Sequence, residues 1–212
     1  MALWAIVPVK PLRRGKSRLS GVLSLEARTA LNHYLLSNTL ETLATVPEIE
    51  HSLVVSRDPE ALTIAREYGA RTVQEQGSPH LNDALTRATM VAISHSVQGV
   101  LIVPADLPLL TAEDIRAVAK RGNDPPVVVI TPDRHHKGTN ALLISPPGLI
   151  RYEYGPGSFQ LHCSQAEKAG ARLEICERVS VALDIDLPED LELAGYELME
   201  AQKVNPAHDF KV

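Results

Sequence analysis

The sequence predicts an α/β fold in which a mostly parallel sheet is covered by helices on both faces. Strand-like segments alternate with segments of helical periodicity almost throughout the 212 residues. Residues 100–103 are apolar at every position, as expected for a strand that is buried on both faces of a sheet. Neither a repeat nor a long linker divides the chain. We therefore expect a single domain at residues 1–204 and a mobile tail at residues 205–212.

Strand-like segments recur from the start of the chain to its last quarter. The stretch at 71–74 and the stretch at 173–176 are short. The predicted strands are residues 3–9, 51–56, 71–74, 100–103, 127–130, 141–144 and 173–176.

The first two helices have clear start and stop signals. Ser24 can cap a long helix that runs to about Thr45. One side of that helix carries Ala27, Leu31, Leu35, Thr39 and Leu43. Pro59 suits the first turn of the next helix, and Gly69 suits the position just beyond its end.

Four further helices are predicted in the rest of the chain. The helix at 112–122 opens with a capping box that begins at Thr111. The last helix has Pro188 near its start and is expected to end near Gln202. The other two are residues 81–96 and 159–170.

Composition narrows the possible functions. A net charge of −5 argues against general binding to nucleic acid or to acidic membranes. No apolar run is long enough for a membrane span, and Met1 leads directly into a strand, so we expect a cytoplasmic protein. The two cysteines, Cys163 and Cys176, have no metal-ligand spacing and are expected to be free thiols.

Asp106 follows the apolar strand at 100–103. In open α/β sheets, ligands bind beyond the carboxyl ends of the strands, so this carboxylate is a candidate for holding a metal or a polar ligand. The alternative is an aspartate that only forms a turn or caps a helix.

A basic segment at residues 10–20 follows the first strand and faces the same edge. Gly15-Lys16-Ser17 is not a phosphate-binding P-loop, because the glycine required five places earlier is replaced by Lys10. The five cations of the segment are Lys10, Arg13, Arg14, Lys16 and Arg18. We favour direct contact of these side chains with phosphates over a solvated basic turn.

Two acids, Asp184 and Asp186, precede the last helix. Two more, Glu189 and Asp190, lie in its first turn and are explained as partners of the helix dipole. Asp184 and Asp186 are explained less well in that way, because they point in the same direction on an extended segment. If this segment adjoins the central strand, one of the two can share a cation with Asp106. Mg²⁺ prefers such carboxylates together with phosphate oxygens.

The start of the helix at 159–170 is a candidate anion site. Ser158 stands where free backbone N–H groups favour an anion, and Gly155 and Gly157 permit close approach of a ligand. Thr139 adds a hydroxyl from a neighbouring loop. Together these suit a small phosphorylated or carboxylated acceptor, although a capped helix after a glycine turn gives the same pattern.

Several polar residues nearby have two interpretations each. His135 and His136 either face solvent or contact the substrate, and His162 either faces the acceptor or packs in the core. Asn82 and Asp83 either reach a base or ribose or cap the helix that follows.

These motifs together carry a family resemblance. They are the basic segment at 10–20, Pro-Ala-Asp-Leu-Pro at 104–108, Gly-Thr-Asn-Ala-Leu at 138–142, Gly-Pro-Gly-Ser-Phe at 155–159 with His162, and Asp-Ile-Asp-Leu-Pro-Glu-Asp-Leu at 184–191. The chain resembles the guanylyltransferases of coenzyme F-420 biosynthesis from its first strand to its last helix. That family comprises archaeal 2-phospho-L-lactate guanylyltransferases and bacterial phosphoenolpyruvate guanylyltransferases.

The resemblance implies a three-layer α/β/α fold with a mixed, mostly parallel sheet, of the nucleotide-diphospho-sugar transferase (glycosyltransferase-A-like) type. It implies GTP, Mg²⁺ and a phosphorylated three-carbon acid as acceptor, and it suggests a homodimer. Matched by motif, Thr139, Gly155 and Ser158 bind the acceptor, while Asp106 and Asp186 bind the metal.

In that reaction Lys16 is the expected catalytic residue, and Lys10 and Arg18 are expected to bind the nucleotide. The chain departs from the family pattern at Leu187, where related enzymes commonly have threonine. A threonine can cap the helix that follows, but a leucine cannot. The acceptor stays open between phosphoenolpyruvate, 2-phospho-L-lactate and 3-phosphoglycerate. Two other functions rank lower: nucleotide transfer to molybdopterin, and a nucleotide-binding regulatory module without activity.

Overall fold

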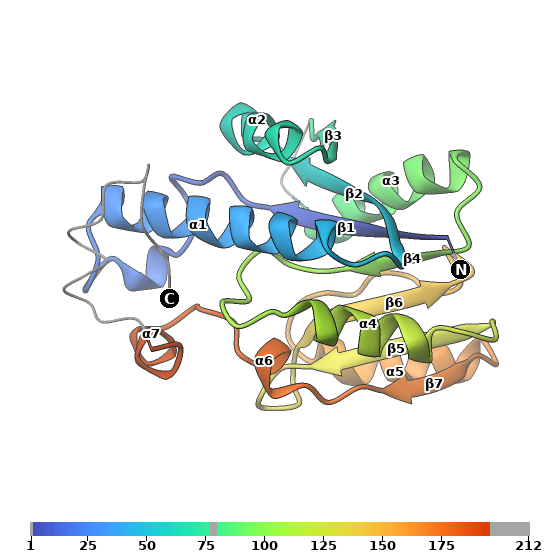
Figure 1. Ribbon diagram of the computed structural model, residues 1–212. Helices are drawn as coiled ribbons and strands as arrows, with labels where there is room; N and C mark the ends of the chain where they lie inside the picture. Colours follow the sequence, from blue (N-terminus) through green and yellow to red (C-terminus); the bar gives the residue numbers. More distant parts are fainter. Residues whose placement is uncertain (1, 77–79, 196–212) are drawn as a thin grey trace.

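The computed structural model describes residues 2–76 and 80–195, which form a seven-stranded sheet with helices on both faces (Figure 1). The strand order is β3-β2-β1-β4-β6-β5-β7. Every pairing is parallel except those of β6, which runs antiparallel to β4 and β5. The strands are β1 (Leu3–Val9), β2 (Ile49–Ser56), β3 (Arg71–Gln74), β4 (Gly99–Ile102), β5 (Val127–Pro132), β6 (Thr139–Ser145) and β7 (Arg172–Ile175). The predicted mixed, mostly parallel sheet is confirmed.

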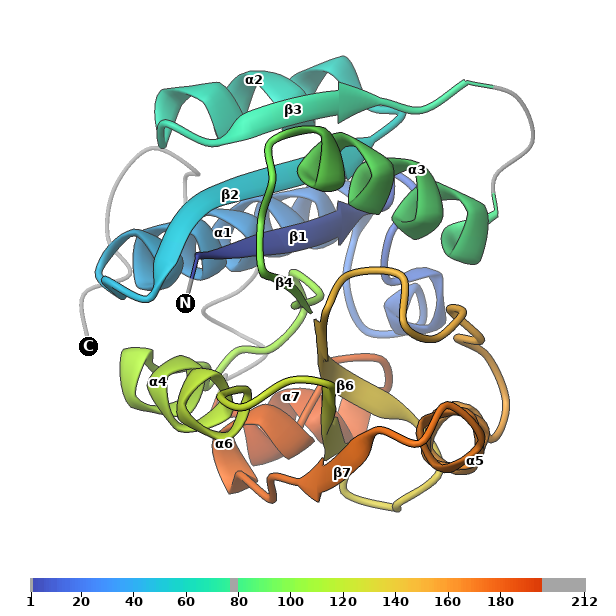
Figure 2. The same ribbon diagram turned by 90° about the vertical axis from the view of Figure 1, so that its right-hand side faces the viewer.

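Helices bury both faces of this sheet. On one face α1, α2 and α4 share a hydrophobic cluster with Leu3, Ala5 and Val7 of β1, and on the other face α3 and α5 share a second cluster with Trp4 and Ile6 (Figure 2). The helices are α1 (Leu25–Ala44), α2 (Pro59–Glu67), α3 (Leu81–Ser94), α4 (Ala112–Arg121), α5 (Ser158–Lys168), α6 (Val179–Ala182) and α7 (Pro188–Leu193). The strongly apolar centre of the sheet follows from this double coverage, because its strands contact no solvent. No helix in the described ranges is long and apolar enough to cross a membrane.

The reversed direction of β6 matters for the site. Ile102 at the end of β4 pairs with Leu142, so the first residues of β6 extend past the point where β4 ends. Thr139 therefore lies at the same edge of the sheet as Asp106. The sequence predicts both strands, but their relative direction depends on which strand each one joins.

The last helix is shorter than predicted. It ends at Leu193 rather than near Gln202, because Gly195 adopts a left-handed conformation (φ 74°) and its amide donates to the carbonyl of Glu192. Such a glycine terminates a helix at little steric cost. Gln202 and the predicted tail at 205–212 lie outside the described residues.

Two short helices were not predicted. A single 3₁₀ turn, η1 (Ser17–Leu19), interrupts the basic segment, and α6 leads into the Asp184–Asp186 stretch. Both are shorter than the span over which helical periodicity can be recognised.

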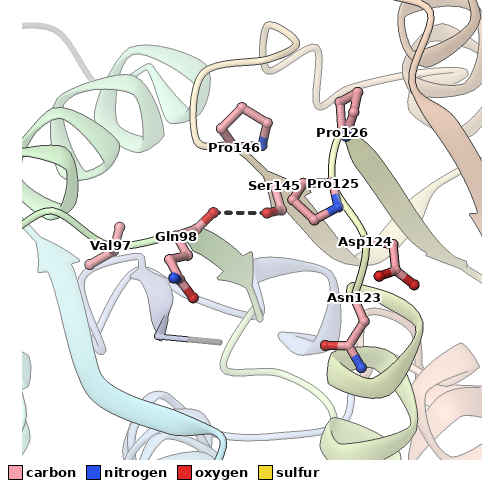
Figure 3. Close-up of a pocket in the computed structure, with 8 residues that line it drawn as sticks. All are labelled: Val97, Gln98, Asn123, Asp124, Pro125, Pro126, Ser145 and Pro146. Carbon is pink, nitrogen blue, oxygen red and sulfur yellow. Dashed lines mark hydrogen bonds between the residues drawn. The ribbon is translucent and has the colours of Figure 1, made fainter.

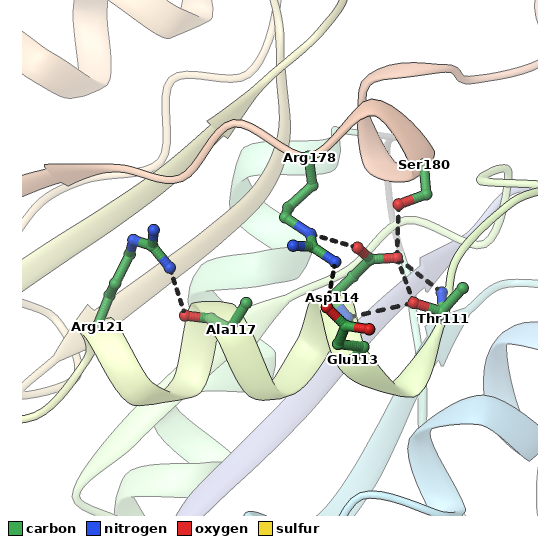
Figure 4. Close-up of polar contacts among 7 residues, drawn as sticks. All are labelled: Thr111, Glu113, Asp114, Ala117, Arg121, Arg178 and Ser180. Atoms are coloured by element: carbon green, nitrogen blue, oxygen red, sulfur yellow. Dashed lines mark hydrogen bonds and ion pairs between the residues drawn. The ribbon is translucent and has the colours of Figure 1, made fainter.

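Asp114 joins α6 to α4. Its carboxylate is fully buried and accepts hydrogen bonds from the Thr111 amide at 2.9 Å and the Thr111 hydroxyl at 2.7 Å, which completes the predicted capping box (Figure 4). It also accepts from the Ser180 hydroxyl at 2.7 Å and from Nε of Arg178 at 2.6 Å. Burial alone would raise the pKa of Asp114, but the bonds from Thr111, Ser180 and Arg178 lower it below its ordinary value. The carboxylate thus holds the segment that immediately precedes Asp184.

We expect Asp114→Ala to lower the free energy of unfolding by about 3 kcal/mol, because it removes a helix cap and leaves the partners of a buried carboxylate unpaired. Urea unfolding followed by circular dichroism measures this. Glu113→Gln is the matched control: Glu113 also contacts Arg178, at 3.2 Å, but its side chain is 79% exposed. That variant is expected to change the free energy by less than about 0.5 kcal/mol. Equal costs in the two variants would contradict the role of Asp114.

Candidate functional site

Three carboxylates gather beyond the end of β4. One oxygen from each of Asp106, Asp184 and Asp186 lies within 4.8 Å of the others. The Asp184–Asp186 segment is joined to the central strand by a hydrogen bond of 3.1 Å from the Ile185 amide to the Asp106 carbonyl. Ile185 is fully buried, so the two aspartates on either side of it face the cluster. The expected proximity of Asp106 and Asp186 is observed, and Asp184 joins them.

The carboxylates of this cluster destabilise one another in the absence of a cation. The pKa of Asp184 is raised because its burial disfavours the charged form and because Asp106 and Asp186 lie close to it. A hard divalent cation fits this donor set, since Mg²⁺ and Ca²⁺ favour carboxylate oxygens. The arrangement therefore matches what a metal site requires.

Lys16 neutralises part of this negative charge. Its amine lies 2.9 Å from Oδ2 of Asp106 and 3.5 Å from Oδ1 of Asp186, and its side chain is only 6% exposed. Burial alone would lower the pKa of Lys16, but the nearby Asp106, Asp186 and Asp184 outweigh burial and raise it. The amine therefore stays charged between the carboxylates.

A tight backbone turn carries Lys16 to this position. The amides of Arg14 and Gly15 both donate to the Pro11 carbonyl, and Lys16 itself adopts a left-handed conformation (φ 55°). A side chain at Gly15 would clash with Asn32, whose amide nitrogen would lie 2.6 Å from the added Cβ. Close packing against α1 thus requires glycine at this position.

The other cations of the basic segment are more exposed. Arg18 lies 3.1 Å from Oδ2 of Asp186 with 69% of its side chain exposed. Lys10 is exposed directly after β1 and is not part of the ion-pair cluster, while Arg13 and Arg14 are also exposed. The structure brings Lys16 and Arg18 to the carboxylates and leaves Lys10 at their edge of the sheet.

The predicted acceptor residues lie at the start of β6 and of α5. Thr139 is buried, and its hydroxyl is 3.0 Å from Nδ1 of His162. Ser158 is the first residue of α5, and its amide donates to the Gly155 carbonyl at 3.1 Å. Gly155 has φ 143° and Gly157 has φ 76°, with open space beside both. Only glycine adopts these conformations readily, so the turn before α5 leaves its backbone accessible to a ligand.

His162 packs inside the protein and also touches the predicted acceptor residue. It is fully buried on α5, and its Nε2 accepts a hydrogen bond of 3.1 Å from the Glu153 amide. Burial lowers its pKa to about 4, so the imidazole is neutral near pH 7. Of the two histidines in the β5–β6 loop, His135 is exposed, and Nε2 of His136 lies 3.7 Å from a carboxylate oxygen of Glu177.

Asn82 supports the turn before α5, a role that was not recognised from the sequence. Asn82 pairs with the backbone of Tyr154, accepting from its amide at 2.8 Å and donating to its carbonyl at 3.2 Å. This contact ties α3 to the turn before α5, while Asp83 stays exposed. The pairing with a residue 72 positions away leaves no local sequence signal.

Asp190 takes over the capping that Leu187 cannot provide. Its Oδ2 accepts from the amides of Asp186 and Leu187 at 2.8 and 2.7 Å, and its Oδ1 lies 2.7 Å from Nη2 of Arg134. The helix therefore begins at Pro188 despite the leucine. Arg134 links this turn to the β5–β6 loop, so the charged residues of that loop have a structural use.

A hollow of about 640 Å³ lies at the opposite end of the sheet, before β4 and β5 (Figure 3). Among the described residues, prolines, amides, Val97, Ser145 and one carboxylate, that of Asp124, line it, and none of these side chains is cationic. Such a surface does not suit a triphosphate. The chemistry of this chain is concentrated at the other end, with Asp106.

The family model described as guanylyl transferase CofC like matches residues 3–200. The chain belongs to this family. It is 41% identical to a phosphoenolpyruvate guanylyltransferase of Rubrobacter xylanophilus over 90% of this chain and 92% of that protein. It is 33% identical to a 2-phospho-L-lactate guanylyltransferase of Methanocaldococcus infernus over 88% of this chain and 81% of that protein.

Solved structures support the fold of this CofC-like chain. A protein of Desulfovibrio desulfuricans G20 assigned to the nucleotide-diphospho-sugar transferases superposes with a TM-score of 0.72, over 91% of this chain and 86% of that one. The two share 16% sequence identity, so the likeness concerns the fold alone. The nucleotide-diphospho-sugar transferase fold implied by the family resemblance is thus confirmed. The guanylyltransferase relatives identify the chain as a nucleotidyltransferase.

The buried neutral state of His162 predicts a pH effect on stability. The pKa of this histidine is about 6.5 in the unfolded chain and about 4 in the folded chain. Between these two pH values the unfolded chain binds a proton at His162 and the folded chain does not. Stability is therefore lost as the pH falls from 6.5 to 4, by on the order of 3 kcal/mol. Urea unfolding of the wild type and of His162→Asn across this range isolates the contribution, because all other groups titrate in both proteins. Parallel pH profiles would contradict it.

Proposed function

We propose that this CofC-like protein transfers GMP from GTP to phosphoenolpyruvate, giving enolpyruvyl-2-diphospho-5'-guanosine and pyrophosphate, in coenzyme F-420 biosynthesis. The observation that carries the proposal is the cluster of Asp106, Asp184 and Asp186 with Lys16 between them. The name of the Rubrobacter relative supports phosphoenolpyruvate as the acceptor. 2-Phospho-L-lactate, named for the more distant Methanocaldococcus relative, and 3-phosphoglycerate are the alternatives.

Charge neutralisation and alignment are the main requirements of this reaction. The attacking phosphate oxygen of the acceptor is already an anion, so no general base is needed. We assign Asp106 and Asp186 as ligands of Mg²⁺, with Asp184 as a further carboxylate within reach. Bound there, the ion supplies positive charge that stabilises the transferring phosphate.

The basic segment supplies the protein's own positive charge. Lys16 is held within reach of the same edge and is assigned as the catalytic residue that stabilises the charge developing on the phosphates. Arg18 and Lys10, both exposed beside it, are assigned to binding the triphosphate. Lys16 is buried between Asp106 and Asp186, so its charge is already held beside the assigned metal ligands.

The acceptor is assigned to the turn before α5. The hydroxyl of Thr139 can donate to an anion, and Gly155, with open space beside it, lets the anion approach the backbone. Ser158 starts α5 and is 2% exposed, so it lines the base of this turn. These contacts orient the acid so that its phosphate faces GTP.

The decisive test is release of pyrophosphate from GTP and Mg²⁺ with each of the three acceptors. We expect turnover with phosphoenolpyruvate and a loss of on the order of a hundredfold or more in Asp106→Ala, because a charge-stabilising group is removed. Asp124→Asn, which changes the carboxylate in the hollow at the far end of the sheet, is the matched control and should retain activity. Faster turnover with 2-phospho-L-lactate or 3-phosphoglycerate would reassign the acceptor.

Absence of turnover with all three acids would contradict the proposal. GTP binding without turnover would then identify the chain as a regulatory module that binds nucleotide. Near-wild-type activity of Asp106→Ala would remove the carboxylate cluster from the mechanism.

Metal binding gives a second, independent test. Titration calorimetry with MgCl₂ in the presence of GTP should show binding that Asp106→Asn and Asp186→Asn each weaken by about tenfold or more. Asp124→Asn should leave the affinity unchanged. A loss of Mg²⁺ affinity in Asp184→Asn would show that the third carboxylate is also a ligand, and an unchanged affinity would show that it is only a neighbour. Equal affinity in the wild type and in Asp106→Asn would exclude the assigned site.

A further inference from the structure

The hydrogen bonds of His162 determine which of its ring nitrogens carries the proton. The Glu153 amide, 3.1 Å from Nε2, is a backbone N–H and can only donate, so Nε2 must be the unprotonated acceptor. In a neutral imidazole the proton then lies on Nδ1. Nδ1 is 3.0 Å from the hydroxyl oxygen of Thr139 and donates to it.

This arrangement leaves the hydroxyl hydrogen of Thr139 free to point elsewhere. The Thr139 side chain is buried, and within residues 2–76 and 80–195 its hydroxyl contacts only His162. A hydroxyl has one donor hydrogen, and here that hydrogen is not used in the contact with Nδ1. A buried donor without an acceptor is costly, so the position suits a ligand that brings an anionic oxygen.

We propose that His162 is a positioning residue of the acceptor site, whose Nδ1–H orients the Thr139 hydroxyl so that it donates to a carboxylate or phosphate oxygen of the acceptor. This inference rests on the proposed function. The opposite tautomer would turn the Thr139 hydrogen toward Nδ1 and present oxygen lone pairs to the anion. The tautomer therefore decides whether this contact attracts or repels the acceptor.

The same histidine also holds the acceptor turn. Its Nε2 binds Glu153, and the next residue, Tyr154, is held by Asn82 and packs against the imidazole with ring centroids 5.1 Å apart. The two residues directly before Gly155 are thus fixed from two sides. Through its two ring nitrogens, His162 thus connects the Thr139 hydroxyl to the glycine turn.

Acceptor kinetics test the orientation of Thr139. Asparagine at position 162 can place its amide nitrogen where Nδ1 was and keep the donation to Thr139, whereas glutamine reaches the place of Nε2 instead. We expect His162→Phe and His162→Gln to raise the KM for phosphoenolpyruvate by about tenfold or more, with the KM for GTP unchanged, because a hydrogen bond to a charged group is lost. His162→Asn should recover most of that loss. Recovery by glutamine but not by asparagine would overturn the inference.

A double-mutant cycle separates this role from a general structural one. In a Thr139→Val background the hydroxyl is absent, so His162→Phe should raise the KM for phosphoenolpyruvate much less than in the wild-type background, because only its contact with Glu153 is then lost. An equal increase in both backgrounds would show that His162 does not act through Thr139. Circular dichroism confirms folding of each variant, and His162→Gln, which also loses the donation to Thr139, replaces the phenylalanine variant if that variant does not fold.

The tautomer can be measured without any turnover. Long-range ¹H–¹⁵N spectra at pH 7 should show a neutral histidine protonated at Nδ1, assigned to position 162 by its absence from His162→Asn. A proton on Nε2 would overturn the inference even if the wild type releases pyrophosphate. If the wild type is inactive with every acceptor, the proposed function fails. The inference is then upheld only if phosphoenolpyruvate shifts the His162 signals in the wild type and not in Thr139→Val.

Discussion

The mutual repulsion of three carboxylates within 4.8 Å is the constraint on which the rest of this site depends. Like charges at that distance cannot all stay ionised without compensation, and burial adds to the cost. Lys16 supplies part of the compensation from a turn that glycine and Asn32 hold against α1. Arg18, 3.1 Å from Asp186, adds a second positive charge, and the remainder is left for a bound cation.

Two other buried aspartates hold this cluster in place. Asp114 anchors α6, which leads to Asp184, and Asp190 binds the amides of Asp186 and Leu187. Each is satisfied by several hydrogen bonds and an arginine, so neither competes for the cation. The acids of this chain thus divide into buried carboxylates that fix the backbone and partly exposed ones that face the ligand. The side chains of Asp114 and Asp190 are 0% and 4% exposed, whereas those of Asp106 and Asp186 are 33% and 43% exposed.

Sequence patterns over a few residues predicted the position of Asp106 at the end of a strand and the capping box at Thr111. Asp106 was found because it follows an apolar strand, and the capping box at Thr111 because its residues are three apart. The direction of β6, the short helix α6 and the pairing of Asn82 with Tyr154 join distant parts of the chain. Periodicity carries no information on such contacts. For the same reason Asp190 was expected only as a partner of the helix dipole, and His162 was left open between the acceptor and the core, since the partners of both are defined only by the tertiary fold.

In the proposed reaction the two halves of the site use different physical means. The proposed nucleotide side, around Asp106 and Lys16, relies on full charges, whose strength depends on the ions present. The proposed acceptor side relies on a neutral imidazole and a hydroxyl, which keep their polarity over a wide pH range because burial lowers the pKa of His162 to about 4. A charged histidine there would attract any anion, including a second nucleotide phosphate. A neutral donor of fixed direction instead discriminates by geometry, which is what selection among small acids of similar charge requires.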